Sequence, residues 1–248
     1  MDLLLCAVAF FAGFVDAVAG GGGLVQLPFL MILRPELAPS VWLGTNKFSS
    51  VFGTTAALFN YSRSLKLPWE ILVPAALVAF FCSLLGASLA SQMPKEFLKP
   101  LIISLLILIF IYTLIRKEWG KLEKHKVKNA FTWTLLAAGG IGFYDGFFGP
   151  GTGGFLIFIF VSVLGMNFLN ASASSKVINW MTNIAALIYF GSTSNIAYEV
   201  GIPMAACNLM GGFIGAKMAL KRGVTFVRVL FYFTVVLALI KLIAEYWL

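Results

Sequence analysis

The sequence predicts an all-α polytopic membrane protein built from two homologous, inverted repeats. Three observations lead to this fold class: an apolar composition, an internal duplication, and a glycine-rich break in each copy. Of the 248 residues, 60% are hydrophobic and 11% are charged, whereas a soluble domain is about one quarter charged. The mean hydropathy is +0.94. Most of the chain is therefore expected within a bilayer, and no stretch is long enough for a separate soluble domain.

Apolar runs recur along the chain, and most have about the 20 residues that cross a bilayer. The first ten residues carry Asp2 and lack the basic region of a secretory signal peptide, so we read them as the start of a retained helix. The runs cover residues 2–33, 41–60, 70–90, 97–115, 131–165, 170–191, 199–219 and 226–247.

The formal net charge of +8 is concentrated in one connector. Six of the eighteen Lys and Arg residues, and the single histidine, His125, lie within residues 116–129. Beside membrane helices such a cluster is typical of a cytoplasmic loop held by the positive-inside rule, and we do not expect a nucleic-acid partner. The predicted organisation is transmembrane repeat 1 (1–115), a basic cytoplasmic connector (116–130) and transmembrane repeat 2 (131–248).

The duplication appears when residue numbers are subtracted. Asp145 minus Asp16 is 129, and Lys176 minus Lys47 is also 129. Residues 13–90 and 142–219 share 17 identities in 78 positions without a gap, against roughly 6 expected if about one position in twelve matches by chance. Shared apolarity does not explain matched Asp, Lys, Pro and Gly residues, so the chain is an internal repeat of the kind common in secondary transporters.

The charges favour inverted rather than parallel repeats. If each half has a first helix, a short re-entrant piece and three more crossings, it crosses an odd net number of times and the halves are inverted. With the connector inside, Arg63, Lys66 and Lys221 also fall inside, as the positive-inside rule requires. Four crossings per half would give parallel repeats with Lys221 outside.

Glycine runs interrupt the first helical segment of each half. We expect one helix to end near Val18 and a short piece to run from Leu24 to Leu33, about 15 Å at 1.5 Å per residue. In the second half, residues 149–154 (GPGTGG) precede a similar piece from Phe155 to Leu164. Unwound backbone at membrane depth needs a cavity or protein partners, and helix N-termini attract anions. Close helix packing is the alternative role for these glycines. The candidate anion-binding backbone comprises Gly21, Gly22, Gly23, Gly151, Thr152 and Gly153.

Lys47 and Lys176 are candidate substrate ligands because a lysine inside a spanning helix is costly and usually lines a pathway. Helical spacing puts Ser50 on the face of Lys47 and Asn179 on the face of Lys176. In an inverted pair the two lysines would approach the midplane from opposite sides. Snorkelling to the near interface is the alternative.

Asp16 and Asp145 precede the glycine breaks by four residues and would be costly in lipid. They are candidates for proton coupling or gating: each could pair with a lysine or with helix-terminal N–H groups, bind a proton, or cap the turn. Glu70 and Glu199 also match at the offset, and we expect them to open helices and complement the helix dipole.

With these residues in view, the chain resembles the sulfite exporter TauE/SafE family of bacterial and archaeal permeases. The resemblance rests on residues 13–30 (GFVDAVAGGGGLVQLPFL) and 43–50 (LGTNKFSS), and on their second copies at 142–158 and 172–179. It implies a permease for sulfite, organosulfonates and related anions, often an exporter. Carried onto this sequence, it adds Thr45, Asn46 and Ser175 to the candidate substrate ligands.

We therefore expect a secondary transporter in a prokaryotic inner membrane that exports a small sulfur-containing anion. Its expected partners are the anion, the lipid bilayer and, through the aspartates, a proton; no cofactor or metal is expected. A passive anion channel or a carboxylate permease remains the alternative. No nucleophile elbow, zinc pattern or P-loop ending is present, so we do not expect an enzyme. The sequence leaves the oligomeric state open, with a homodimer as one arrangement.

Overall fold

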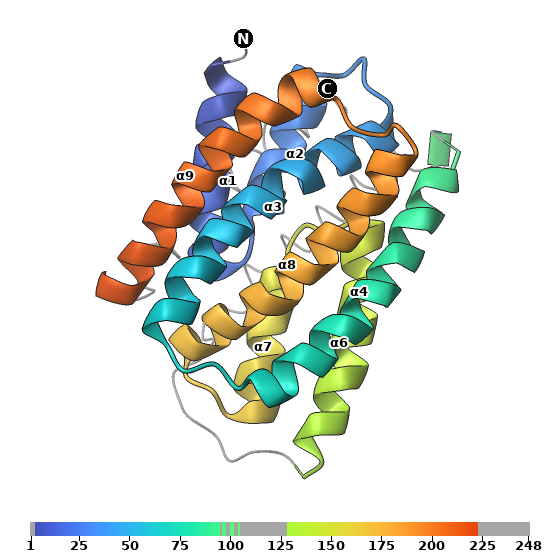
Figure 1. Cartoon of the computed structure of the whole chain (residues 1–248). Coiled ribbons are helices and arrows are strands. Elements are labelled where there is room, and N and C mark those ends of the chain that lie inside the picture. Colours follow the sequence, from blue (N-terminus) through green and yellow to red (C-terminus); the bar gives the residue numbers. More distant parts are fainter. Residues whose placement is uncertain (1–2, 95, 98–99, 102–103, 105–127, 223–248) are drawn as a thin grey trace.

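The computed structural model describes residues 3–94, 96–97, 100–101, 104 and 128–222. Within these ranges every regular element is a helix (Figure 1). Most of the basic connector, including His125, and the last apolar run, 226–247, lie outside the described residues. The helices are α1 (Leu3–Ala19), α2 (Gly22–Leu33), α3 (Pro39–Ser64), α4 (Trp69–Gln92), α6 (Ala130–Phe147), α7 (Thr152–Leu164), α8 (Phe168–Ser192) and α9 (Tyr198–Arg222).

The helices of the two halves follow the same order and have nearly the same lengths. Adding 129 to the bounds of α3 gives 168–193, and α8 covers 168–192. The same addition to α4 gives 198–221, and α9 covers 198–222. Glu70 and Glu199 lie in the first turns of α4 and α9, as expected. The duplication in the sequence is therefore matched by a duplication of helices.

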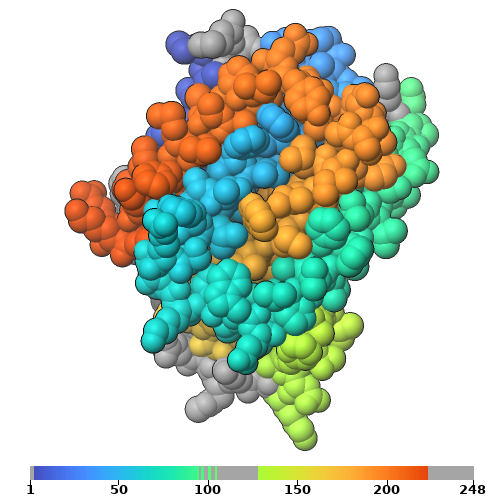
Figure 2. All heavy atoms as spheres, in the orientation of Figure 1, coloured from blue at the N-terminus to red at the C-terminus, as the bar shows by residue number. Residues whose placement is uncertain are grey.

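The two halves interlock rather than lying side by side as separate units. The first helix of each half packs along the last described helix of the other: α1 against α9, and α6 against α4. Figure 1 shows α3 and α8 running side by side between these two outer pairs, with α2 and α7 behind them. The space-filling view shows the same succession of α9, α3, α8 and α4 across the front face (Figure 2).

Glycines allow the outer pairs to approach closely, and they do so at equivalent positions. A Cβ on Gly86 would meet the backbone of Phe143, and one on Gly215 would meet the backbone of Phe14. These contacts are equivalent, since 86 + 129 = 215 and 14 + 129 = 143. Small residues at such crossings let helix backbones touch.

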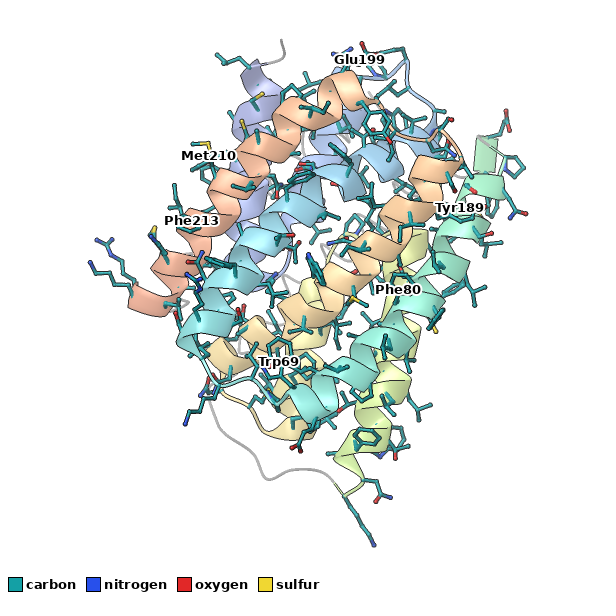
Figure 3. All side chains as sticks on the ribbon, in the orientation of Figure 1. Trp69, Phe80, Tyr189, Glu199, Met210 and Phe213 are labelled. Atoms are coloured by element: carbon teal, nitrogen blue, oxygen red, sulfur yellow. The ribbon has the colours of Figure 1, made fainter. Side chains whose placement is uncertain are left out.

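The bundle differs from a soluble protein in its buried charges and in its apolar outer faces. Lys47, Lys176 and Asp145 are buried. Large apolar side chains are exposed on the outer faces of α4, α6 and α9; Met210 and Phe213, for example, stand away from the bundle on α9 (Figure 3). Charged side chains held inside, with apolar side chains facing outward, are the arrangement expected in lipid.

In the described part of the chain, only α4 is both long and apolar enough to cross a membrane by length and composition. The helices α1, α2 and α7 are apolar but shorter. The helices α3 and α8 are long enough, at 26 and 25 residues, but they carry the buried polar side chains of the interior. These polar side chains lower the mean hydropathy of α3 and α8.

We predict that Gly146→Leu destabilises the protein and that Gly140→Leu on the same helix does not. A Cβ at Gly146 would lie 2.6 Å from the Ser83 carbonyl carbon, whereas nothing lies within 4 Å of a Cβ at Gly140. Overpacking of this kind costs about 1–3 kcal/mol or more. Thermal unfolding of the purified protein in detergent measures it, and equal unfolding temperatures for the two variants would contradict this account of the α4–α6 contact.

Candidate functional site

The two helix breaks are shorter than the sequence analysis predicted. The helix α2 begins at Gly22 rather than Leu24, and α7 begins at Thr152 rather than Phe155. Those predicted starts were wrong because glycine is tolerated in the first turn of a helix, where its N–H lacks an intrahelical acceptor in any case. The backbone of the first break is thus limited to residues 20–21.

Backbone conformation is conserved between the two breaks. Gly20 has φ = +73° and Gly149, its equivalent at the offset of 129, has φ = +98°. L-residues other than glycine rarely adopt such angles. The breaks also touch each other: Gly154 N donates to Gly20 O at 3.0 Å, and a Cβ on Gly20 would lie 2.5 Å from the Cα of Gly153. A larger residue at this point would force the two breaks apart.

Two interior ion pairs, one buried and one partly buried, lie beside the breaks, and each joins the two halves. Lys47 Nζ is 2.7 Å from Asp145 Oδ1, and Lys176 Nζ is 3.0 Å from Asp16 Oδ2. Each lysine therefore pairs with the aspartate of the opposite repeat. Of the alternatives that the sequence left open for the aspartates, the structure shows pairing with lysine.

Lys47 is positioned to make one further hydrogen bond. It comes from α3, its side chain is 3% exposed, and its ammonium also donates to Asn183 Oδ1 of α8 at 3.0 Å. An ammonium has three N–H donors, and Asp145 and Asn183 accept two of them. The third is available to a molecule in the adjoining pocket.

Lys176 is held more completely by the end of α1. Its ammonium donates to both the carboxylate and the main-chain oxygen of Asp16, and its side chain is fully buried. Tyr61 and Ser172 donate to the neighbouring carbonyls of Ala17 and Val18 at 2.8 and 2.9 Å. The carbonyl end of a helix carries partial negative charge, so a lysine is favoured there.

Asp145 leaves one carboxylate oxygen unused. Its side chain is 1% exposed, and Oδ1 accepts from Lys47 while Oδ2 has no hydrogen-bond partner. A buried, unpaired acceptor is costly. The site thus contains an oxygen that can take up a proton or accept a hydrogen bond from a ligand.

A small polar pocket lies between the breaks and the ion pairs. It leaves about 20 Å³ in which the centre of a water molecule can lie, and one water needs about 10–15 Å³. In this conformation the pocket must widen before it can admit a ligand larger than a water molecule. Its walls are formed by Asp16, Gly20, Gly23, Asn46, Lys47, Ser50, Asp145, Gly149, Gly151, Thr152, Gly153, Asn179 and Asn183.

The structure brings together most, but not all, of the residues singled out in the sequence. Lys176, Gly21 and Gly22 adjoin the pocket without lining it. Thr45 and Ser175 are engaged elsewhere: Thr45 Oγ1 accepts from Ala197 N, and Ser175 Oγ donates to the Ser172 carbonyl. Candidate ligands that do line it are Lys47, Asn46, Ser50, Asn179, Gly23, Gly151, Thr152 and Gly153, together with Asp16 and Asp145.

Sequence reasoning missed two buried amides, Gln26 and Asn208. Gln26 lies in α2 and Asn208 in α9, and both are buried. Neither has a polar counterpart at the offset of 129, where the chain has Phe155 and Ala79. The signal that could have found them is the presence of an uncharged amide within an otherwise apolar run.

The fold and the site together define a class. Helices with an apolar exterior enclose buried charges and unwound backbone, and such backbone occurs at membrane depth only where protein or a cavity satisfies it. The geometry is that of a membrane transport protein of the broken-helix kind.

The chain belongs to the sulfite exporter TauE/SafE family, whose model matches residues 5–242. A "probable membrane transporter protein ORF9" of Sinorhizobium sp. is 34% identical over 97% of this chain and 92% of its own length. A "probable membrane transporter protein" of Haemophilus influenzae is 35% identical over 92% and 89%. The corresponding protein YfcA of Escherichia coli K12 is 31% identical over 91% and 83%. No solved structure matches significantly. The names of these relatives point to a membrane transporter rather than an enzyme.

Proposed function

We propose that this protein is a secondary transporter that exports small sulfur-containing anions, such as sulfite or organosulfonates, by alternating access. The family description supports the substrate class. The observation that carries the proposal is the pair of Lys–Asp bridges that cross between the repeats beside two helix breaks and a polar pocket.

The arrangement of the half-helices supports inverted repeats. Figure 1 shows α2 in the upper half of the view and α7 in the lower half, with the two breaks between them. Their first turns, at Gly23 and Gly153, both line the pocket. Helix N-termini that converge on one point concentrate unpaired N–H groups and partial positive charge, which suits an anion.

An anion in the widened pocket would meet donors from both halves. The third N–H of Lys47, the first turns of α2 and α7, and the side chain of Asn46 all border the space. The Thr152 hydroxyl also lines it, but its hydrogen is donated to the Gly149 carbonyl at 2.6 Å. Lysine supplies a point charge, while the neutral donors complete the hydrogen bonds of a three-oxygen sulfonate head. Lys176 binds Asp16 in this conformation, and by the symmetry of the repeats it would take over the role of Lys47 in the opposite-facing state.

The charges at the site favour coupling to one proton. Lys47, Lys176, Asp16 and Asp145 sum to zero when all are ionised, so a bound monoanion leaves a net charge of −1 in a buried site. Uncompensated buried charge is strongly unfavourable. One proton on an aspartate restores neutrality. Asp145 is the better carrier, because its Oδ2 is without a partner and, once protonated, could donate to an oxygen of the anion.

The proposed membrane setting is the prokaryotic inner membrane, crossed several times, with the connector 116–130 on the cytoplasmic side. A homodimer is compatible with this proposal but not required by it, because the pocket is lined by residues of one chain.

We predict that Lys47→Met weakens binding of sulfite and methanesulfonate by at least tenfold, because a hydrogen bond to a charged group contributes about 1.5–3 kcal/mol. The double variant Lys47→Ala with Lys176→Ala should abolish substrate counterflow in proteoliposomes. Lys217→Met is the matched control, since Lys217 is exposed on α9 and its ammonium lies over the ring of Phe213.

Full counterflow by the double alanine variant would overturn the binding proposal. Acetate that competes as well as methanesulfonate would indicate a carboxylate permease, and flux without counterflow would indicate a channel; either result contradicts the proposed function.

We also predict that Asp145→Asn uncouples transport from protons. Methanesulfonate is the suitable probe because its sulfonate stays ionised and cannot carry the proton itself. A pH-sensitive dye inside proteoliposomes should report proton movement with methanesulfonate for the unchanged protein and none for the variant. Methanesulfonate exchange should persist, since it needs no net proton transfer. Proton movement of wild-type size in the variant would exclude Asp145 as the carrier.

A further inference from the structure

A chain of buried polar side chains leads from α1 through Asn208 of α9 to the pocket, and its residues are not repeated at the offset of 129. Asn208 Nδ2 donates to the main-chain oxygen of Ala9 at 3.0 Å and to Gln26 Oε1 at 2.8 Å. Gln26 Nε2 in turn donates to Asn46 Oδ1 at 3.0 Å. Ser49 Oγ donates to Gln26 Oε1 at 3.2 Å. All four side chains are buried.

The hydrogen bonds fix the orientation of each amide in this chain. A main-chain carbonyl can only accept, so the Ala9 oxygen requires the NH₂ group of Asn208 to face it. The NH₂ group of Asn208 also donates to Gln26, so the atom of Gln26 that faces Asn208 must be its oxygen. The NH₂ group of Gln26 then faces Asn46. A second contact supports this orientation: Gln26 Nε2 lies 3.4 Å from the main-chain oxygen of Asn46, which can only accept a hydrogen bond.

The consequence reaches the pocket through Asn46. Because its Oδ1 accepts from Gln26, its NH₂ group must point the other way, and Asn46 lines the pocket. A Cβ placed on Gly23 would lie 3.6 Å from Asn46 Nδ2, so this nitrogen lies beside the first turn of α2. In the described part of the chain, no protein group accepts a hydrogen bond from it.

The second repeat shows that the fold does not need this chain of amides. At the offset of 129, Gln26 corresponds to Phe155, Ser49 to Ile178, and Asn46 to Ser175. Asn208 corresponds to Ala79. Ser175 donates to the Ser172 carbonyl at 2.7 Å and does not line the pocket. The equivalent helices thus pack with mainly apolar side chains, and the position equivalent to Asn46 places no amide at the pocket.

We propose that Gln26 is a positioning residue that presents the Asn46 NH₂ group, rather than its oxygen, to the transported anion. This inference rests on the proposed function. Without Gln26 the amide of Asn46 is free to turn, and its oxygen would then repel the anion's oxygens. The Gln26–Asn208 pair thereby selects for acceptor-rich anions and makes the two halves contribute unequally to binding.

A double-mutant cycle tests the proposal in the full chain, with methanesulfonate binding measured by titration calorimetry. Gln26→Met keeps the length of the side chain and removes its polar groups. We expect it to raise the dissociation constant about tenfold, the size of a hydrogen bond to a charged ligand. In an Asn46→Ala background the same change should alter the constant less than twofold, because Gln26 acts through Asn46.

Two further variants keep the result interpretable. Ser83→Ala removes another buried interhelical hydrogen bond, to the Thr182 carbonyl at 2.8 Å, from a residue that does not line the pocket, and it should leave affinity unchanged. If Gln26→Met does not fold, the triple variant Gln26→Phe, Ser49→Ile and Asn208→Ala transplants the residues of the second repeat and should fold with the same loss of affinity.

The outcomes separate this inference from the proposed function. Wild-type affinity in the Gln26→Met or the triple variant, or an equal loss in the Asn46→Ala background, overturns the positioning role while the transporter proposal stands. Failure of the unchanged protein to bind methanesulfonate, with sulfite also unbound, overturns the proposed function and this inference with it.

Discussion

Two buried lysines each pair with an aspartate inside a bundle whose exterior is apolar, and this pairing constrains the rest of the structure. Removing one partner of such a pair leaves an uncompensated charge and costs about 3–5 kcal/mol. Since Lys47 pairs with Asp145 and Lys176 with Asp16, neither half satisfies its own charges. The interlocked packing of α1 with α9 and of α6 with α4 is the arrangement that brings each lysine to the opposite aspartate.

Glycine breaks and ion pairs form one unit because both occur at the same helix ends. The breaks at Gly20 and Gly149 stop α1 and α6 a few residues after the aspartates. Main-chain groups that the breaks leave outside the helices are therefore close to the lysines. Lys176, for example, donates to the main-chain oxygen of Asp16. The breaks also leave the first turns of α2 and α7 next to the pocket, and the first N–H groups of a helix are not used by the helix itself.

Much of this architecture could be predicted from the sequence because it repeats. The offset of 129 identified Asp16, Lys47 and the glycines, and the structure gathers them around one pocket. The pairing itself could not be predicted, since it depends on how the halves interlock rather than on spacing along the chain. Gln26 could not be found in this way because the equivalent position of the second repeat is Phe155. The orientation of its amide, in turn, is determined by Asn46 and Asn208, which are close in space but distant in sequence.

The central claim is that the anion binds the remaining N–H of Lys47 beside the amide of Asn46, and a structure determined with methanesulfonate bound tests it most directly. We predict an anion in the widened pocket with its oxygens within hydrogen-bond distance of Lys47 Nζ and Asn46 Nδ2. An anion bound elsewhere, with no contact to either nitrogen, would contradict it.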